Sequence, residues 1–435
     1  MIGAGLAGCE ASYQLAKRGI EVDLYDIKPT SFTPAHSNPN FAEIVCSNSL
    51  KSFDTTTASG LLKEEMKCFD SLILNTAYEC RTPAGNALAV DRELFSKKIT
   101  EKIRSFKNIN IINKNVTTLP DGIVIVATGP LTTSELLTTL QNKFDSKNLF
   151  FYDASSPIVE FSSIDMNKAF VKDRYDKGNG DYINCPMNKT EYENFYHELI
   201  SAESVELKNF EKKEIFEGCM PIEVMAKRGV DSIRFGPLKP VGLDNPKTKE
   251  KYYAVVQLRK EDNTNNLFNL VGFQTNLTFG EQKRVFSLIP GLENAKFVKY
   301  GVMHRNSYIN APNIINNHFQ VKNDKNIFIA GQLSGVEGYM ESTMSGLIAG
   351  INAYLMINGK SCLELSSNTM MGAISNYIST ASPKNFQPMN ANFGIVSPLE
   401  YKEKDDKVKK EKLVLRAISE VKNVEKRLNE TWFCN

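Results

Sequence analysis

The chain has 435 residues, and its 52 Lys and Arg against 50 Asp and Glu give a formal net charge of +2. So small a charge excludes a global attraction for nucleic acid, and any site for a polyanion must be a local basic patch. Hydrophobic residues make up 42% of the chain, which allows a sizeable core spread over two or three structural units. No run approaches the roughly eighteen apolar residues of a membrane span, so no membrane partner is expected.

The eight cysteines are scattered along the chain without a CxxC pair. That spacing fits neither a zinc site nor a small disulfide scaffold, so we expect no metal. The chain opens directly on glycine-rich sequence, without the basic segment and long apolar core of a secretory signal. We therefore expect reduced thiols and a cytoplasmic location.

The N-terminus carries a glycine-rich motif of the kind that binds dinucleotides. The GxGxxG pattern is formed by Gly3, Ala4, Gly5, Leu6, Ala7 and Gly8. The first glycine permits a tight turn, the second lets a pyrophosphate approach the backbone, and the third allows a helix to pack closely on a strand. The phosphates then meet the N-terminus of that helix, where unpaired N–H groups and the helix dipole favour anions.

The elements around the motif support this interpretation. Residues 9–18 predict a helix that Gly19 is well placed to end. Residues 20–26 alternate as a strand ending in Asp26, whose carboxylate can accept hydrogen bonds from ribose hydroxyls. An acid at this position favours an unphosphorylated ribose, as in FAD or NAD. Only two residues precede the first glycine, where a strand of about five is usual, so we expect the natural chain to start a few residues earlier.

Two distant segments repeat the pattern of a strand followed by a glycine turn. The strands are predicted at 122–127 and 326–330, and a helix is predicted from Gly335 to Ala353. The residues that follow the two strands are Thr128, Gly129, Gly331 and Gln332. Two-domain flavoproteins use such segments near the adenosine and the flavin, so these residues favour FAD over NAD.

The expected fold class is α/β, with a Rossmann-like FAD-binding domain of the two-dinucleotide-binding-domain flavoprotein type and an inserted α+β domain. The parts expected are the first part of the FAD-binding domain at 1–150, the inserted substrate- and RNA-facing domain at 151–310, the second part of the FAD-binding domain at 311–365, and a C-terminal helical segment at 366–435. In the last part, one helical stripe carries Val414, Ile418, Val421 and Leu428. Such a stripe predicts a surface helix that packs on the body.

Cys46 and Cys219 are the candidate reactive thiols. Cysteine is usually a small core residue, and a structural role is the alternative for both. Their polar surroundings, rich in glycine and proline, favour exposure instead. An exposed thiolate can add to an electron-poor ring carbon, and a nearby cation lowers its pKa. Disulfide reductase chemistry is not expected, because no cysteine has a partner three or five positions away.

Basic and aromatic residues interleave after Cys219, and the basic ones include Arg228, Lys283 and Arg284. Charge for phosphates together with rings for unpaired bases is the combination that RNA binding uses. Acids intervene, so an ordinary solvated surface is the alternative. His304 is one of four histidines, and it is either a structural histidine or a flat ring that stacks on a ligand.

Long sequence blocks, in order along almost the whole chain, carry a resemblance. They include GAGLAG at the start, FAEIVCSNSL around Cys46, PAGNALAVDRE at 83–93, FEGCMPIEVMAKRG at 216–229 and AGQLSGVEGYMES at 330–342. The chain thereby resembles the folate- and FAD-dependent RNA uracil-5-methyltransferases. The best-known members of that family act on the T-loop uridine of tRNA.

The resemblance implies both the chemistry and the roles of residues. A reduced flavin takes the methylene carbon of 5,10-methylenetetrahydrofolate, passes it to uridine C5 and supplies a hydride, and NAD(P)H reduces the flavin again. C5 becomes nucleophilic only after a thiolate adds at C6. By motif, Cys219 is the nucleophile at C6 and Cys46 its partner at C5. His304 and Glu341 are implied to lie beside the flavin and contact the folate.

The RNA substrate is expected to be the T-loop uridine of tRNA. The same chemistry on a uridine of 23S ribosomal RNA is the alternative, since the Lys- and Asn-rich composition is typical of AT-rich genomes, which often lose or reassign modification enzymes. Two further alternatives involve no methyl transfer. One is a flavin-dependent NAD(P)H oxidoreductase without an RNA substrate, and the other is a non-catalytic RNA-binding flavoprotein.

Overall fold

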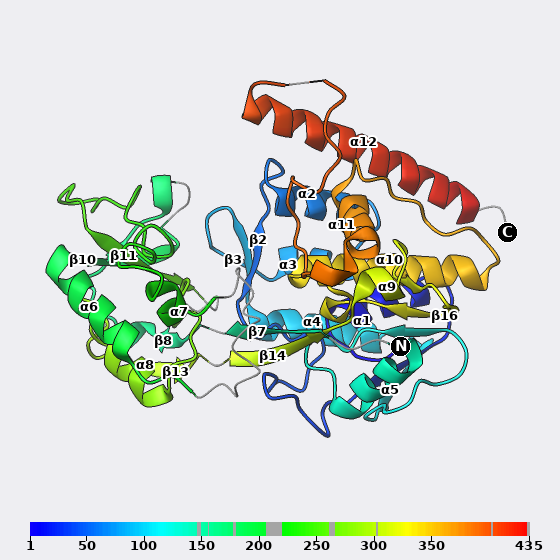
Figure 1. Ribbon diagram of the computed structural model, residues 1–435, viewed down its shortest axis with the longest axis horizontal. Coiled ribbons are helices and arrows are strands. Elements are labelled where there is room, and N and C mark those ends of the chain that lie inside the picture. Colours follow the sequence, from blue (N-terminus) through cyan, green and yellow to red (C-terminus); the bar gives the residue numbers. More distant parts are fainter. Residues whose placement is uncertain are drawn as a thin grey trace.

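The computed structural model describes residues 1–145, 149–154, 156–176, 180–205, 220–260, 266–301, 303–401 and 403–432. Figure 1 shows a larger body formed by both ends of the chain and a smaller one, mostly green, formed by its middle. Each body has its own hydrophobic core, as separate domains do. Cys219, the predicted nucleophile, lies outside the described residues.

A largely parallel sheet forms the centre of the larger body. Its strands are β1 (Val22–Asp26), β5 (Ile109–Asn113), β6 (Val124–Val126), β16 (Asp324–Ile329) and the short antiparallel β15 (Gln320–Val321). β1 runs parallel to β5, and β6 runs parallel to β16 with Val124 opposite Ile327. Ile2 joins the two pairs, because it bridges both Tyr25 and Val126. The two distant segments that repeat the strand-and-turn pattern are therefore neighbours in one sheet.

Helices pack around this sheet. They are α1 (Leu6–Ala16), α2 (Ala58–Lys67), α3 (Leu72–Glu79), α4 (Arg92–Arg104), α5 (Ser134–Phe144), α9 (Ala311–Ile314), α10 (Tyr339–Ile357) and α11 (Met370–Thr380), with the 3-10 turns η4 (Gln332–Ser334) and η5 (Pro383–Asn385). α1 and α10 approach closely, since a Cβ atom at Gly346 would lie 2.2 Å from the carbonyl oxygen of Ala7. Only glycine permits that approach, which presses α10 against the helix of the glycine motif.

Two predicted helices begin at other residues than expected. α1 begins at Leu6, three residues early, because Gly5 is its N-cap and the second half of the glycine motif is already helical. α10 begins only at Tyr339, because Gly335 at φ 86° and Gly338 at φ 119° interrupt the chain after η4. Both differences leave a helix N-terminus just after a glycine turn.

A small antiparallel sheet follows the segment that carries Cys46. Its strands lie in the order β2 (Ser49–Ser52), β4 (Ala87–Val90) and β3 (Arg81–Thr82). The amide of Val90 donates a hydrogen bond of 3.0 Å to the carbonyl oxygen of Asn48. This ladder fixes the backbone immediately after Cys46, and thus helps to place the thiol.

The smaller body is an α+β unit with a six-stranded antiparallel sheet. The strand order is β13 (Phe297–Lys299), β8 (Ile158–Glu160), β12 (Leu267–Leu270), β11 (Ala254–Lys260), β10 (Tyr182–Met187) and β9 (Phe170–Val171). The helices are α6 (Lys189–Ser201), α7 (Ile222–Ala226) and α8 (Phe279–Phe286), with 3-10 turns η1 (Phe161–Ser163) and η2 (Arg174–Asp176). The antiparallel pair of β7 (Leu149–Ala154) and β14 (Met303–Tyr308) runs between the two bodies (Figure 1). Below, the smaller body is called the inserted domain.

The C-terminal segment ends in one long helix, α12 (Asp406–Trp432), drawn in red across the top of Figure 1. Val414, Val421 and Leu428 are buried and Ile418 is partly buried, which confirms the predicted apolar stripe. Among the described residues, no helix combines the length and the apolar character that crossing a membrane requires.

Candidate functional site

A cavity lies where β1, β6 and β16 end. Most of the predicted cofactor residues line it, namely Gly3, Ala4, Gly5, Leu6, Ala7, Asp26, Thr128, Gly129, Gly331 and Gln332. The crevice at the carboxyl ends of the strands is where open α/β sheets bind their ligands. Gly8 is absent from this lining because it lies beneath the turn, where a Cβ atom would be 1.8 Å from the carbonyl oxygen of Gly3.

The glycine turn has the shape that a bound pyrophosphate needs. Gly3 has φ +96°, and a Cβ atom there would lie 2.5 Å from the carbonyl oxygen of Ala127. Above Gly5, by contrast, a Cβ atom would meet no other atom within 4 Å, so the backbone faces open space. Gly5 is also the N-cap of α1 and provides no side-chain cap for it. The N–H groups of the first helical turn can therefore be satisfied by an anion.

Asp26 stands at the end of β1 beside this turn. One carboxylate oxygen accepts a 2.6 Å hydrogen bond from the amide of Ala4, and the other accepts a 2.8 Å bond from the amide of Lys28. Each oxygen keeps a further lone pair. The carboxylate is thus fixed against the glycine turn and can still accept hydrogen bonds from ribose hydroxyls, so turn and acid together fit the adenosine half of FAD.

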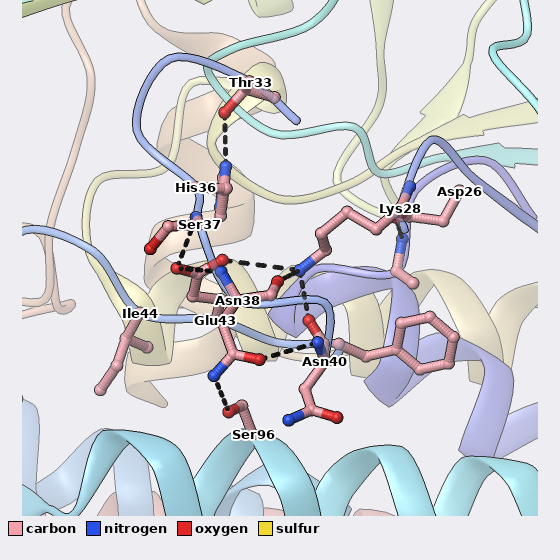
Figure 2. Close-up of polar contacts among 12 residues, drawn as sticks. Asp26, Lys28, Thr33, His36, Ser37, Asn38, Asn40, Glu43, Ile44 and Ser96 are labelled. Atoms are coloured by element: carbon pink, nitrogen blue, oxygen red, sulfur yellow. Dashed lines mark hydrogen bonds and ion pairs between the residues drawn. The ribbon is translucent and has the colours of Figure 1, made fainter. Parts of the chain in front are cut away.

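A network that the sequence motifs did not reveal holds the next segment against the cavity (Figure 2). The Lys28 ammonium is buried and lies 3.7 Å from a carboxylate oxygen of Glu43. Glu43 in turn accepts hydrogen bonds from the amides of Ser37 at 3.0 Å and Asn38 at 3.2 Å. His36 lines the cavity, and burial lowers the pKa of its ring. The only sequence signal was the position of Glu43 three residues before Cys46.

Cys46 lines the same cavity. Its Sγ lies 2.9 Å from the hydroxyl of Tyr339, at the start of α10. That hydroxyl oxygen accepts hydrogen bonds from the amides of Val45 at 3.1 Å and Cys46 at 2.9 Å. Because the oxygen is occupied by these donors, the phenol hydrogen is the group left to point at Sγ.

Burial, with the neighbouring Cys46 as the next cause, raises the pKa of Tyr339 well above its usual value. The hydroxyl therefore keeps its proton at neutral pH. A proton-bearing donor at this distance stabilises a thiolate more than a thiol. The arrangement can thus hold the Cys46 sulfur in one orientation, with a hydrogen-bond donor directed at it.

The other predicted chemical residues do not all meet at this cavity. His304 lies on β14, where only the backbone is described, paired with Asp153. Glu341 is buried outside the cavity lining, where one of its oxygens accepts hydrogen bonds from the Lys51 ammonium and the Ala391 amide, each at 3.0 Å. Its other oxygen has no hydrogen-bond partner among the described residues.

The predicted RNA-binding residues lie on the inserted domain. Arg228 is exposed just after α7, and Lys283 is exposed on α8. Arg284 is exposed too, but it pairs with Glu281 at 2.8 Å and also with Glu198. An arginine with two carboxylate partners has less charge to offer a phosphate, so on α8 Lys283 is a stronger candidate than Arg284. Within the described part of the chain, no three His, Cys, Asp or Glu residues gather as metal ligands.

Comparison with known proteins gives consistent matches. Residues 1–361 match the family model for glucose inhibited division protein A. The methylenetetrahydrofolate–tRNA-(uracil-5-)-methyltransferase TrmFO of Bacillus cereus is 53% identical over 97% of this chain and 98% of its own. The protein of the same name from Halalkalibacterium halodurans is 51% identical over 98% of each chain. Among solved structures, GidA of Aquifex aeolicus gives a TM-score of 0.69 at 17% identity, covering 98% of this chain and 75% of that one.

Proposed function

Because this chain belongs to the glucose inhibited division protein A family, and within it to the group of the methylenetetrahydrofolate–tRNA-(uracil-5-)-methyltransferases, we propose that it forms 5-methyluridine in tRNA. The carbon would come from 5,10-methylenetetrahydrofolate. The matches confirm the resemblance seen in the sequence blocks and the predicted α/β flavoprotein fold. The observation that carries the proposal is a thiol, Cys46, held by Tyr339 in the cavity of a dinucleotide-binding turn.

FAD is the cofactor that the cavity fits. The open backbone at Gly5 and the uncapped start of α1 would hold the pyrophosphate, and Asp26 would hold the adenosine ribose. Bound in its reduced form, FAD would supply the electrons that reduce the transferred carbon to a methyl group. Cys46 and Tyr339 line the same cavity, so the reacting end of the cofactor would meet the thiol there.

The protein's own groups would handle the uracil ring. In the proposed reaction the Cys219 thiolate adds to C6, which makes C5 nucleophilic, and C5 forms a bond to the one-carbon unit. The Cys46 thiolate then accepts the proton that leaves C5. The bond between the one-carbon unit and the nitrogen that carried it would break, and the hydride that reduced FAD supplies would reach that carbon as Cys219 leaves C6, which restores the ring with a methyl group on C5. Tyr339 supports the proton transfer to Cys46, because its hydrogen bond stabilises the thiolate before the proton arrives. His304 and Glu341 remain the proposed contacts of the folate.

The remaining assignments are also proposals. NAD(P)H would reduce the flavin after each turnover, and the reaction would take place in the cytoplasm. The T-loop uridine is the proposed target, and the names of the curated relatives favour tRNA over 23S ribosomal RNA. Arg228 and Lys283 would contact the RNA backbone from the inserted domain.

One assay tests the proposal. Purified protein loaded with FAD is incubated with methylenetetrahydrofolate, with NADH or NADPH, and with either tRNA or 23S ribosomal RNA transcripts, and the RNA is digested to nucleosides. We expect 5-methyluridine from the tRNA only, dependent on the folate and absent with Cys219→Ala. If only the ribosomal RNA were methylated, 23S ribosomal RNA would be the substrate instead of tRNA. NAD(P)H oxidation without any methylated nucleoside would favour the oxidoreductase alternative.

A further inference from the structure

The inserted domain forms hydrogen bonds with the two residues that follow Cys46. The guanidinium of Arg259, on β11, donates from Nε to Oδ1 of Asn48 at 3.1 Å and from Nη2 to Oγ of Ser47 at 2.8 Å. The side-chain amide of Asn48 donates back to the carbonyl oxygen of Lys260 at 2.8 Å. These three hydrogen bonds cross from one domain to the other, within two residues of the thiol.

The arginine is held rigidly at this seam. Arg259 is 8% exposed and Asn48 is fully buried, so solvent screens the contact little. β11 pairs with strands on both sides, with Arg259 opposite Tyr182 on β10 and Asn269 on β12. A planar guanidinium that uses two of its nitrogens fixes direction as well as distance. The contact therefore sets the position of the Ser47–Asn48 turn relative to the inserted sheet.

The chain before Cys46 is anchored to the other domain, as Figure 2 shows. Glu43 binds the amides of Ser37 and Asn38, and the Lys28 ammonium donates to the carbonyl oxygens of Asn38 at 3.3 Å and of Asn40. The Asn38 side chain also reaches Ser96 on α4 at 3.4 Å. Residues 37–43 thus follow the FAD-binding domain, whereas Ser47 and Asn48 bind both domains, since Asn48 also accepts the hydrogen bond from the Val90 amide. Cys46 lies directly before the residues through which Arg259 connects the inserted domain to this segment.

We propose that Arg259 is a positioning residue for the Cys46 thiol. Through its hydrogen bonds to Ser47 and Asn48, it fixes the position of the thiol relative to the inserted domain. The orientation of the thiol then depends on how that domain is docked. The catalytic part of this inference rests on the proposed function, whereas the geometric part can be tested without RNA or folate. Arg259 and Ser47 are 212 residues apart in sequence, so their contact forms only when the two domains have docked.

The test compares Arg259→Met, Arg259→Lys and Ser47→Ala with a control, Lys168→Met. Lys168 belongs to the same domain, and its exposed ion pair with Glu293 contributes little to stability. FAD absorbance reports the cofactor, and mass spectrometry follows iodoacetamide labelling of the Cys46 peptide in the absence of RNA. We expect Arg259→Met to retain FAD and to label at least about threefold faster, because the segment opens locally more often. Arg259→Lys should behave likewise, since an ammonium cannot reproduce the fork.

Turnover gives the second readout. Arg259→Met should lower kcat roughly 10- to 100-fold with little change in KM for tRNA, because the reacting thiol is misplaced rather than the RNA released. Combining Arg259→Met with Ser47→Ala should add little to the larger single effect. If the Cys46 peptide of Arg259→Met is labelled no faster than that of the Lys168→Met control, the inference is wrong. If Arg259→Met loses FAD, the Ser47→Ala variant is used instead, and labelling of Ser47→Ala at the wild-type rate would also show that the inference is wrong. A wild-type protein without methyl transfer refutes only the proposed function, since labelling is measured independently.

Discussion

The glycine turn and the thiol segment line one cavity but are built in different ways. The turn is local, because Asp26 reaches Ala4 across 22 positions of sequence. The thiol segment is not, because Cys46 meets Tyr339 across 293 positions and Ser47 meets Arg259 across 212. The FAD-binding domain alone can form the first, since Ala127, which packs on Gly3, also belongs to it, whereas the second needs both domains and the late helix α10.

This difference separates binding from chemistry. The turn owes its shape to steric demands at Gly3 and Gly8, which hold whatever the inserted domain does. The thiol owes its orientation to hydrogen bonds from two other parts of the chain. Changes in the turn should therefore remove the cofactor, and changes around the thiol should leave the cofactor bound while altering the reaction.

Gly5→Val should have the largest effect on the first region. A Cβ atom at Gly5 meets no other residue within 4 Å, so the new side chain extends into the open space that the pyrophosphate needs. We expect a folded protein without flavin absorbance after purification and after reconstitution with FAD. Gly280→Val is the matched control, since a Cβ atom there also meets nothing within 4 Å. Normal flavin content in Gly5→Val would mean that the cofactor binds elsewhere.

Cys46→Ala should have the largest effect on the second region. It removes the proposed proton acceptor and little volume, so FAD should stay bound while methyl transfer falls by about 10²- to 10⁴-fold. Rates are measured as 5-methyluridine formed per flavin. Cys68→Ala is the control, because Cys68 is a partly buried thiol outside the cavity lining. Loss of FAD from Cys46→Ala would show that the thiol segment also contributes to cofactor binding.

Tyr339→Phe should change the thiol more gently. The hydroxyl lies 2.9 Å from Sγ and donates to it, and a hydrogen-bond donor stabilises the thiolate that reacts with iodoacetamide. Labelling of the Cys46 peptide with iodoacetamide at pH 7 should therefore slow about tenfold without the hydroxyl. Tyr377→Phe is a suitable control, since Tyr377 donates to the Gln387 carbonyl. An unchanged labelling rate would show that the hydroxyl does not act on the thiol.

Lys283→Ala should have the smallest effect of these variants. It should change RNA binding but neither the glycine turn nor the thiol segment. Loss of one phosphate contact should weaken RNA binding and reduce the slope of log affinity against log salt by about 0.7 to 0.9. Arg284→Ala should change the slope less, because Arg284 already pairs with Glu281 and Glu198. Flavin content and Cys46 labelling should stay normal in both. Equal slopes for Lys283→Ala and the wild type would place the RNA on another surface.

The two regions also differ in how far the sequence could predict them. Gly3, Gly5, Gly8 and Asp26 have a fixed spacing because one strand, one turn and one helix determine their geometry. That spacing predicted their common site, and the structure brings all but Gly8 to one cavity. Local patterns also predicted the strands at 122–127 and 326–330 and the stripe of α12.

The partners of the thiol could not be predicted in this way. Tyr339 and Arg259 have no spacing relation to Cys46, because their contacts depend on the docking of α10 and β11. The resemblance identified the thiol, but not what holds it. Glu341 shows the same limit, since its block was recognised while its contacts with Lys51 and Ala391 depend on tertiary packing.

The most direct test of the proposed function measures the transfer of carbon itself. FAD-loaded wild type and Cys46→Ala, at equal flavin content, are incubated with tRNA and methylenetetrahydrofolate labelled with ¹³C in the methylene group, and the nucleosides are analysed by mass spectrometry. We expect labelled 5-methyluridine from the wild type and almost none from the variant. Labelled product from both at the same rate, or none from a wild type that holds FAD, would contradict the proposed function.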